Sequence, residues 1–160
     1  MGNYLFWDSH KNLEVAKKYG FKENPHEFER TYRKSSNVDD IHENGIKDYL
    51  KFIKFGYGRA TDHTSKDIRL GNMTRDQGIE MVKKYDHVKA RESLNFFLEM
   101  TGITEEEFDI TADKFRDPRV WFIKNNQWYK KNIWGDESAY GEVHLKNEER
   151  EKYEYKDNKL

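Results

Sequence analysis

Apolar residues recur at helical spacing in the segment GIKDYLKFIKF, residues 45–55. The residues that share one face of this pattern are Ile46, Tyr49, Leu50, Ile53 and Tyr57. Phe52 and Phe55 add apolar surface on another side, so the segment has little polar surface. A helix of this kind is expected to be buried, and we predict that the core is built on it.

Helix boundary signals mark four further segments. Thr74 stands three residues before Gln77, the capping-box spacing that opens a helix, and Thr104 and Glu107 repeat it. Helices are predicted in HKNLEVAKKYG, MTRDQGIEMVKKYD, ARESLNFFLEMTG and TEEEFDITADKFRDP, with Ser9 as the first cap and Gly20 and Gly102 as end signals. The expected inner residues of these helices are Ile79, Val82, Tyr85, Leu94, Phe97, Leu98, Phe108, Ala112 and Phe115.

The last part of the chain changes character. RVWFIK and QWYKKNIW are rich in aromatic and β-branched residues and flank the turn-prone pair Asn125 and Asn126, which predicts a β-hairpin. NYLFWD predicts a residual strand end near the N-terminus, and residues 21–44 a long loop. Residues 136–160 are expected to form a charged tail, either flexible or a solvated helix. The predicted fold class is therefore mainly α with one small hairpin.

Composition narrows the functional classes. The 160 residues carry 29 basic and 30 acidic side chains, so no overall field would gather nucleic acid or an anionic membrane, and neither is expected as a partner. The absence of cysteine excludes disulfides and thiolate metal sites. No apolar run reaches about 18 residues, and the first residues lack the pattern of a secretory signal. We therefore expect a cytoplasmic protein.

The most unusual stretch is KFGYGRATDHTSKDIRLG, residues 54–71, directly behind the apolar segment. If the part after Gly58 is helical, the side chains close to one face are Arg59, Asp62, His63, Lys66 and Arg69. Arginine binds phosphate or carboxylate in a fork, aspartate fixes sugar hydroxyls and histidine moves protons, so this face suits an anionic or polyhydroxyl ligand. Gly56 and Gly58 would let backbone amides approach it. A solvated face with ion pairs such as Asp62 to Lys66 is the alternative that spacing leaves open.

Other clusters are weaker candidates. DDIHE, residues 39–43, gathers carboxylates and a histidine, but such groups on a loop usually face water, and no metal site is predicted. Trp121, Trp128 and Trp134 could stack on sugars or bases, although core or interface positions suit their spacing better. Basic residues within 47–59 lie among aromatic ones, but the dense acids nearby argue against RNA binding.

The stretch YLKFIKFGYGRATDHTSKDIRLGNMTRDQGIEMVKKYD, residues 49–86, closely resembles the C-terminal signature of the N-acetyl sugar amidotransferases of bacterial surface-polysaccharide biosynthesis. The flanking WDSHKNLEVAKKYGF and GITEEEFDITADKFRDPRVW are similar as well, and the resemblance covers roughly residues 4–134. It implies that residues 1–135 are the C-terminal helical part of such an enzyme. The family's N-terminal loop, S-G-G-x-D-S, and its cysteine pairs do not occur in this sequence.

The resemblance implies a chemistry for the family, which is similar to the ATP-pyrophosphatases. ATP with Mg²⁺ activates the acetamido carbonyl of a nucleotide-linked or related N-acetyl sugar, and ammonia from a glutaminase partner displaces the activated oxygen to give an acetamidino group. The product belongs to lipopolysaccharide O-antigen or a related surface glycan. The substrate-binding residues that the resemblance favours are Lys54, Tyr57, Arg59, Asp62, His63 and Arg69, with Gly56 and Gly58 for backbone approach.

Two hypotheses follow for the chain. In the first it is the substrate-binding and assembly part of the amidotransferase, working with an ATP-binding domain in cis or trans; alone it is expected to bind no ATP, because the loop whose amides cradle phosphates is absent. In the second it is a stand-alone helical interaction module without catalysis. The first predicts exposed apolar surface at NYLFW and at the Trp-rich hairpin, which self-association into a homo-oligomer would cover.

Overall fold

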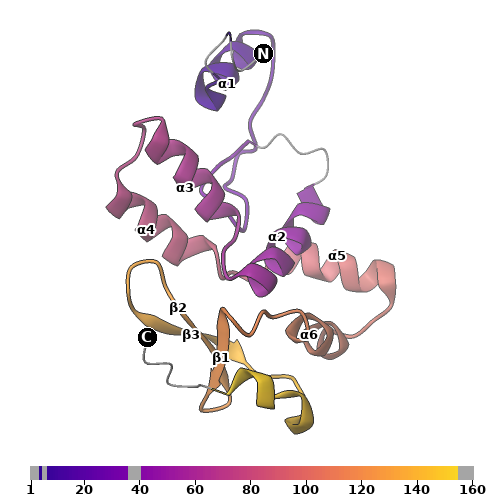
Figure 1. Ribbon diagram of the computed structural model, residues 1–160. Helices are drawn as coiled ribbons and strands as arrows, with labels where there is room; N and C mark the ends of the chain where they lie inside the picture. The colour runs from indigo at the N-terminus through magenta and orange to yellow at the C-terminus, as the bar shows by residue number, and fades with distance from the viewer. Residues whose placement is uncertain (1–3, 5–6, 36–40, 155–160) are drawn as a thin grey trace.

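The computed structural model describes residues 4, 7–35 and 41–154, with side chains from residue 45 onward in the last range (Figure 1). The described residues form a mainly helical fold with one small antiparallel sheet, as predicted. The helices and strands are α1 (Ser9–Lys18), α2 (Ile41–Phe55), α3 (Arg59–Arg69), α4 (Arg75–Tyr85), α5 (Arg91–Thr101), α6 (Glu105–Asp113), β1 (Trp121–Lys124), β2 (Gln127–Lys131) and β3 (Glu137–Glu142), followed by the 3₁₀ turns η1 (Asn147–Glu149) and η2 (Glu151–Tyr153).

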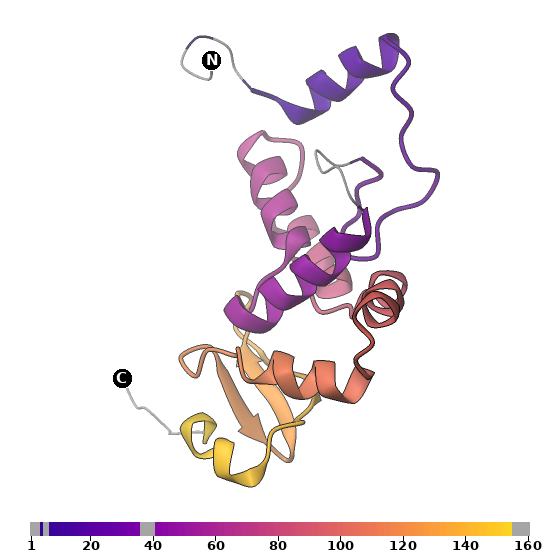
Figure 2. The same ribbon diagram turned by 90° about the vertical axis from the view of Figure 1, so that its right-hand side faces the viewer.

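Helix α2 is the centre of the core, which confirms the prediction from its apolar pattern. Ile53 is 2% exposed and packs in a cluster with Leu94 of α5 and Phe108 of α6. Phe52, on another side of α2, packs against Trp121 and the rest of the sheet cluster, with the two ring centroids 5.4 Å apart. Figure 2 shows α2 crossing the middle of the molecule, with the sheet on one side of it. One helix therefore joins two apolar clusters.

The predicted helix caps have mixed outcomes. Thr74 and Thr104 both form complete capping boxes, and Gly102 ends α5 in the left-handed conformation with φ 72°, as expected. The cap of α1 is Asp8, one residue before the predicted Ser9, and its carboxylate accepts a hydrogen bond from the His10 amide over 2.9 Å. Aspartate and serine both cap well, so sequence preference does not separate them.

Phe115 was predicted to be buried with α6 and is instead 59% exposed. The helix ends at Asp113, and the amide of Phe115 closes a tighter turn onto the carbonyl of Ala112. Phe115 therefore lies beyond the helix, and its side chain does not share the buried face of Phe108 and Ala112.

The predicted hairpin is present, with a third strand added. Asn125 and Asn126 both have positive φ, 52° and 57°, as the tight turn between twisted strands requires. Strand β1 pairs antiparallel with β2, so that Trp121 lies opposite Lys130, and β2 pairs antiparallel with β3. Trp121 and Trp128 are almost completely buried, so the exposed Trp-rich surface expected on the hairpin is absent at these two residues.

Residues 136–160 were predicted to form a flexible tail or a solvated helix, which is wrong for the described part, residues 136–154. Strand β3 and η2 lie in this range, and Val143, Leu145 and Tyr153 are buried. The Tyr153 ring meets that of Trp128 edge to face at 4.8 Å between centroids. Three apolar residues scattered among charges carry little periodicity, and long-range packing on the Trp cluster fixes the segment.

The long loop predicted for residues 21–44 ends earlier, because α2 begins at Ile41. Its described part is anchored in the core: Arg30 and Thr31 are both buried. Most of the predicted strand end lies outside the described residues. In the DDIHE cluster, residues 39–40 are not described, and the side chains of residues 41–43 are not described either. Of NYLFW, only Tyr4 and Trp7 are described, and both are exposed, as expected. In the same described part of the chain, no helix is long and apolar enough to cross a membrane.

Candidate functional site

A buried carboxylate sets the start of α3. Gly58 is the N-terminal cap residue but has no side chain to close the helix. Asp86, which follows α4, takes that role: its carboxylate accepts hydrogen bonds from the amides of Gly58 (2.8 Å) and Thr61 (3.1 Å). The carbonyl of Asp86 in turn accepts a bond from Arg30 Nη2 at 2.5 Å. The first turn of α3, the end of α4 and the loop before α2 therefore meet at one residue.

The two glycines predicted to approach a ligand have roles within the fold. A Cβ at Gly58 would lie 2.8 Å from Arg30 Nη2. The backbone amide of Gly58 is already hydrogen-bonded to the carboxylate of Asp86. Gly56 has φ 75°, and a Cβ there would lie 2.6 Å from Val120 Cγ1. The turn from α2 to α3 therefore needs glycine at both positions, and the Gly58 amide is not free for a ligand.

The charged face of α3 lines a recess of about 360 Å³, which we call the cationic groove. The residues of the cationic groove are Tyr57, Arg59, Thr61, Asp62, His63, Ser65, Lys66 and Arg69. Five of the six predicted substrate-binding side chains lie here together. The sixth, Lys54, lies on the exposed side of α2 with its Nζ 5.2 Å from the centroid of the Phe55 ring, and it does not line the groove.

The groove carries surplus positive charge. Arg59 Nε donates to the buried carboxylate of Asp48 over 2.7 Å. Asp62 is paired with Lys51 across to α2 at 2.5 Å, so the alternative pairing with Lys66 along α3 does not form. Lys66 and Arg69 have no carboxylate partner in the described part of the chain. Two exposed cations are thus available to an anionic ligand.

His63 is the buried floor of the groove. Its Nδ1 is 2.6 Å from Thr31 Oγ1. Burial, followed by the positive charges of Arg33, Arg59 and Lys66, lowers the pKa of His63 to about 3. At neutral pH the ring is therefore uncharged and acts as a hydrogen-bonding partner, in contrast to the proton-moving role expected from sequence.

A carboxylate behind the groove ties the N-terminal segment to α3. Asp67 is 2% exposed and accepts hydrogen bonds from Arg33 Nη2 (2.6 Å) and from the hydroxyl of Tyr32. His10 Nε2 of α1 lies 2.8 Å from the same carboxylate. Sequence reasoning missed this cluster because its members are far apart in the chain and no local pattern joins them.

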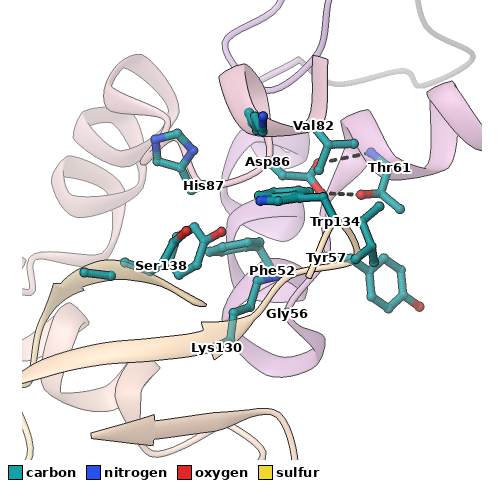
Figure 3. Close-up of a pocket in the computed structure, with 14 residues that line it drawn as sticks. Phe52, Gly56, Tyr57, Thr61, Val82, Asp86, His87, Lys130, Trp134 and Ser138 are labelled. Carbon is teal, nitrogen blue, oxygen red and sulfur yellow. Dashed lines mark hydrogen bonds between the residues drawn. The ribbon is translucent and has the colours of Figure 1, made fainter. Parts of the chain in front are cut away.

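A second recess of about 220 Å³ lies between α2, the ends of α3 and α4, and the sheet (Figure 3). We call it the aromatic cavity; it is lined by Phe52, Gly56, Tyr57, Thr61, Val82, Lys83, Asp86, His87, Lys130, Ile133, Trp134, Ser138, Ala139 and Tyr140. Tyr57 and Thr61 also line the cationic groove, so the two recesses adjoin. Of the three tryptophans considered for stacking, only Trp134 lines this cavity, as Trp121 and Trp128 lie in the core.

No sequence pattern selects Asp86 or Lys130 as a candidate site residue. Lys130 stands in a strand whose neighbours, Tyr129 and Lys131, are also polar or amphipathic, and only the pairing of β2 places it inward. Asp86 follows a helix whose last turn is basic, which reads locally as a solvated end. The signal that identifies both is burial of a charge, which appears only in the folded chain.

Comparison with known proteins identifies the family. The WbpG-like LPS biosynthesis proteins have a C-terminal domain whose profile matches residues 14–133 of the chain. The match includes all the residues of the cationic groove and stops just before Trp134 in the aromatic cavity. No curated protein matches the chain. The chain therefore belongs to the WbpG-like family of lipopolysaccharide (LPS) biosynthesis proteins and carries its C-terminal domain.

Proposed function

We propose that the chain is the substrate-binding and assembly part of an ATP-dependent N-acetyl sugar amidotransferase. The reaction converts the acetamido group of the sugar to an acetamidino group with ammonia from a glutaminase partner, in the biosynthesis of LPS O-antigen or a related surface glycan. Family membership supports the pathway. The observation that carries the substrate role is the cationic groove, in which Lys66 and Arg69 have no carboxylate partner among the described residues.

The groove suits the diphosphate of a nucleotide-linked sugar. Arg69 offers a planar fork of donors to phosphate oxygens, and Lys66 a mobile point charge. Asp62, 36% exposed in its side chain and held by Lys51, is placed to accept hydrogen bonds from sugar hydroxyls. Arg59, fixed by Asp48, adds positive charge without freedom to move. Such preorganised groups orient a substrate and lower the barrier to reaction at its carbonyl.

ATP and Mg²⁺ belong to another part of the proposed enzyme. Helix N-termini bind phosphate through free backbone amides, but the start of α3 is already occupied by the carboxylate of Asp86. A phosphate there would also face that negative charge. We therefore assign ATP binding to a domain supplied in cis or trans, and ammonia supply to the glutaminase partner.

Calorimetric titration with UDP-N-acetylglucosamine tests the substrate role. Lys66→Ala/Arg69→Ala should weaken binding by about tenfold or more, with a smaller loss as salt is raised. Lys18→Ala/Lys22→Ala removes the same charge from the N-terminal segment, outside both recesses, and should leave the affinity unchanged. Equal affinity of the two double variants, or no binding by the wild-type chain, would refute the proposal.

A second candidate function, a helical interaction module, is favoured by one observation. Helix α1 buries none of its residues, and Trp7, Val15 and Tyr19 are exposed on and beside it. Figure 1 shows α1 at one end of the molecule, away from the sheet. A partner domain or a second copy of the chain would cover this surface. Light scattering on the wild type and on Trp7→Ser/Tyr19→Ser separates self-association through this surface from a monomer.

A further inference from the structure

Lys130 is a lysine buried at the wall of the aromatic cavity. The residue as a whole is 7% exposed. Figure 3 shows the Lys130 side chain extending from β2 toward Phe52 and Trp134. Nζ donates one hydrogen bond, to Asn132 Oδ1 at 2.8 Å. An ammonium group carries three donors, and the other two have no acceptor in the described part of the chain.

The charge of Lys130 has no direct counterion among the residues that the structure describes. No carboxylate of the described residues lies within ion-pair distance of Nζ; Asp86 acts on it only from farther away. The carboxylate of Asp86 is itself bonded to Gly58 and Thr61. Burial lowers the pKa of Lys130, and the charge of Asp86 raises it. Burying an ammonium ion costs free energy unless a partner compensates for it.

Asn132 positions Lys130. The buried Asn132 Oδ1 accepts from Lys130 and also from the Tyr140 hydroxyl at 2.5 Å, while its Nδ2 donates to Ser138 Oγ at 2.8 Å. The Tyr140 ring centroid lies 5.2 Å from the Lys130 Nζ. The lysine is thus oriented by three strand and loop side chains and is not a freely moving surface group.

The rest of the cavity is suited to a ring. Trp134 is partly buried, with Lys83 Nζ 5.5 Å from its ring centroid, and Tyr140 lies on the sheet side. His87 packs edge to face on Tyr140, 6.0 Å between centroids. A volume of about 220 Å³ is smaller than a typical drug-sized pocket, so it admits one small ring.

We infer that the aromatic cavity is a binding site for a small ring-shaped ligand with one anionic substituent, a carboxylate or a phosphate, and that the Lys130 ammonium group binds this substituent. The anion supplies the missing counterion and accepts the two unused N–H bonds. Trp134 and Tyr140 pack on the ring. This goes beyond the proposed function, because such binding requires neither a nucleotide nor ATP, and Lys130 does not line the cationic groove.

Four probes test the inference, each titrated into the full chain and followed by NMR. Glucose, glucuronate and glucose 6-phosphate share one sugar ring and differ in its substituent, and inorganic phosphate has no ring. We expect glucuronate or glucose 6-phosphate to bind about tenfold or more tightly than glucose. Preference between these two tells a carboxylate from a phosphate. Equal binding of glucose and both acids, or binding of inorganic phosphate as tightly as of the better acid, would contradict the inference.

Lys130→Met should abolish the preference for the acidic probe, whereas Lys131→Met, an exposed neighbour on the same strand, should preserve it. Retained preference in Lys130→Met would contradict the inference. Melting temperature distinguishes a structural role, since a binding lysine replaced by an apolar side chain of similar length should leave it unchanged or raised. A marked fall in melting temperature would show that Lys130 serves the fold and would overturn its assignment.

Trp134→Ala provides an independent variant in a partly buried loop. This substitution should weaken binding of the tighter-binding acidic sugar by about tenfold and leave binding of inorganic phosphate unaffected, because only the contact with the ring is lost. An unchanged affinity for the acidic sugar would contradict the role of the ring. Because these probes carry no nucleotide, their failure refutes the cavity site alone, and failure of the UDP-sugar titration refutes the groove alone.

Discussion

Arg59 shows how a single side chain can serve both fold and site. Its guanidinium group bonds to Asp48, whose side chain is 7% exposed, so Arg59→Ala leaves a buried carboxylate without its partner. We predict a loss of about 1–3 kcal/mol in the free energy of unfolding, measured by urea titration.

A double-mutant cycle tests that prediction. Arg59→Ala/Asp48→Asn removes the orphaned charge and should recover part of the loss. If the double variant is as unstable as the sum of the two single variants, the pair makes no coupled contribution. Lys66 and Arg69 are better probes of ligand binding, because neither is tied to a carboxylate of the described residues.

His63 makes the stability depend on pH in a defined direction. Its pKa is lowered to about 3 in the folded chain, against 6.5 for the free group, because burial disfavours the charged ring. The unfolded chain therefore takes up a proton first as the pH falls. The contribution of neutral His63 is present above about pH 6.5 and is lost as the pH falls toward 3.

The expected slope is at most about 1.4 kcal/mol per pH unit in this window. Unfolding of wild type and His63→Gln between about pH 7.5 and 5, above the range of most carboxylates, should show a flatter curve for the variant. His26→Gln, on the exposed loop, should retain the wild-type slope. Parallel curves for wild type and His63→Gln would contradict the buried, uncharged state of His63.

At the scale of elements, the packing of α2 on α5 overrides helix propensity. Alanine favours a helix interior over glycine by about 1 kcal/mol. A Cβ at Gly45 in α2 would, however, lie 2.0 Å from Ser93 Oγ and 2.5 Å from Ser93 Cβ of α5. Gly45→Ala should therefore destabilise the fold by about 1–3 kcal/mol in urea unfolding.

Two further variants give this prediction its control. Gly45→Ala/Ser93→Gly should regain most of the loss, because the clashing atoms are removed. A Cβ at Gly78 in α4 would meet the flexible end of Ile68 at 2.9 Å and Thr64 Cβ at 3.4 Å, an ordinary contact distance, so Gly78→Ala should cost little. A stabilising Gly45→Ala would mean that the two helices are farther apart than described.

Local chemistry was enough to predict several elements. The capping boxes at Thr74 and Thr104 and the turn at Asn125 and Asn126 depend on residues a few positions apart, and all formed as expected. Strand β3 was missed because its burial pattern alternates only weakly and its pairing with β2 is set by the Trp cluster. A helix after Gly58 was assumed as a condition and is present as α3. Its cap, Asp86, lies 28 positions from Gly58.

The candidate site, like the fold, could be predicted from the sequence only in part. The helical spacing after Gly58 was sufficient to bring Arg59, Asp62, His63, Lys66 and Arg69 into one groove, whereas Tyr57 was selected only by the family resemblance. The aromatic cavity required contacts between α2, α4 and the sheet, and the buried charges of Asp86 and Lys130 became visible only through them. Sequence patterns report one element at a time, whereas a cavity between elements depends on tertiary packing.

At the scale of the whole molecule, the two recesses adjoin at Tyr57 and Thr61. The large exposed apolar residues of the N-terminal segment, Trp7 and Tyr19, line neither recess. The proposed ligand surface and the proposed assembly surface are therefore separate, and variants of one should leave the other unchanged. This separation allows the amidotransferase part and the interaction module to be distinguished in one protein.

The most direct test of the substrate role is an NMR titration of the ¹⁵N-labelled chain with UDP-N-acetylglucosamine. Bound ligand should shift the backbone amide signals of Tyr57 and of α3, Arg59–Arg69, in a saturable way, and leave those of α1 and α5 in place. Lys66→Ala/Arg69→Ala should suppress the shifts. Saturable shifts confined to α1 or α5, or no shifts at all, would contradict the assignment of the cationic groove as the substrate site.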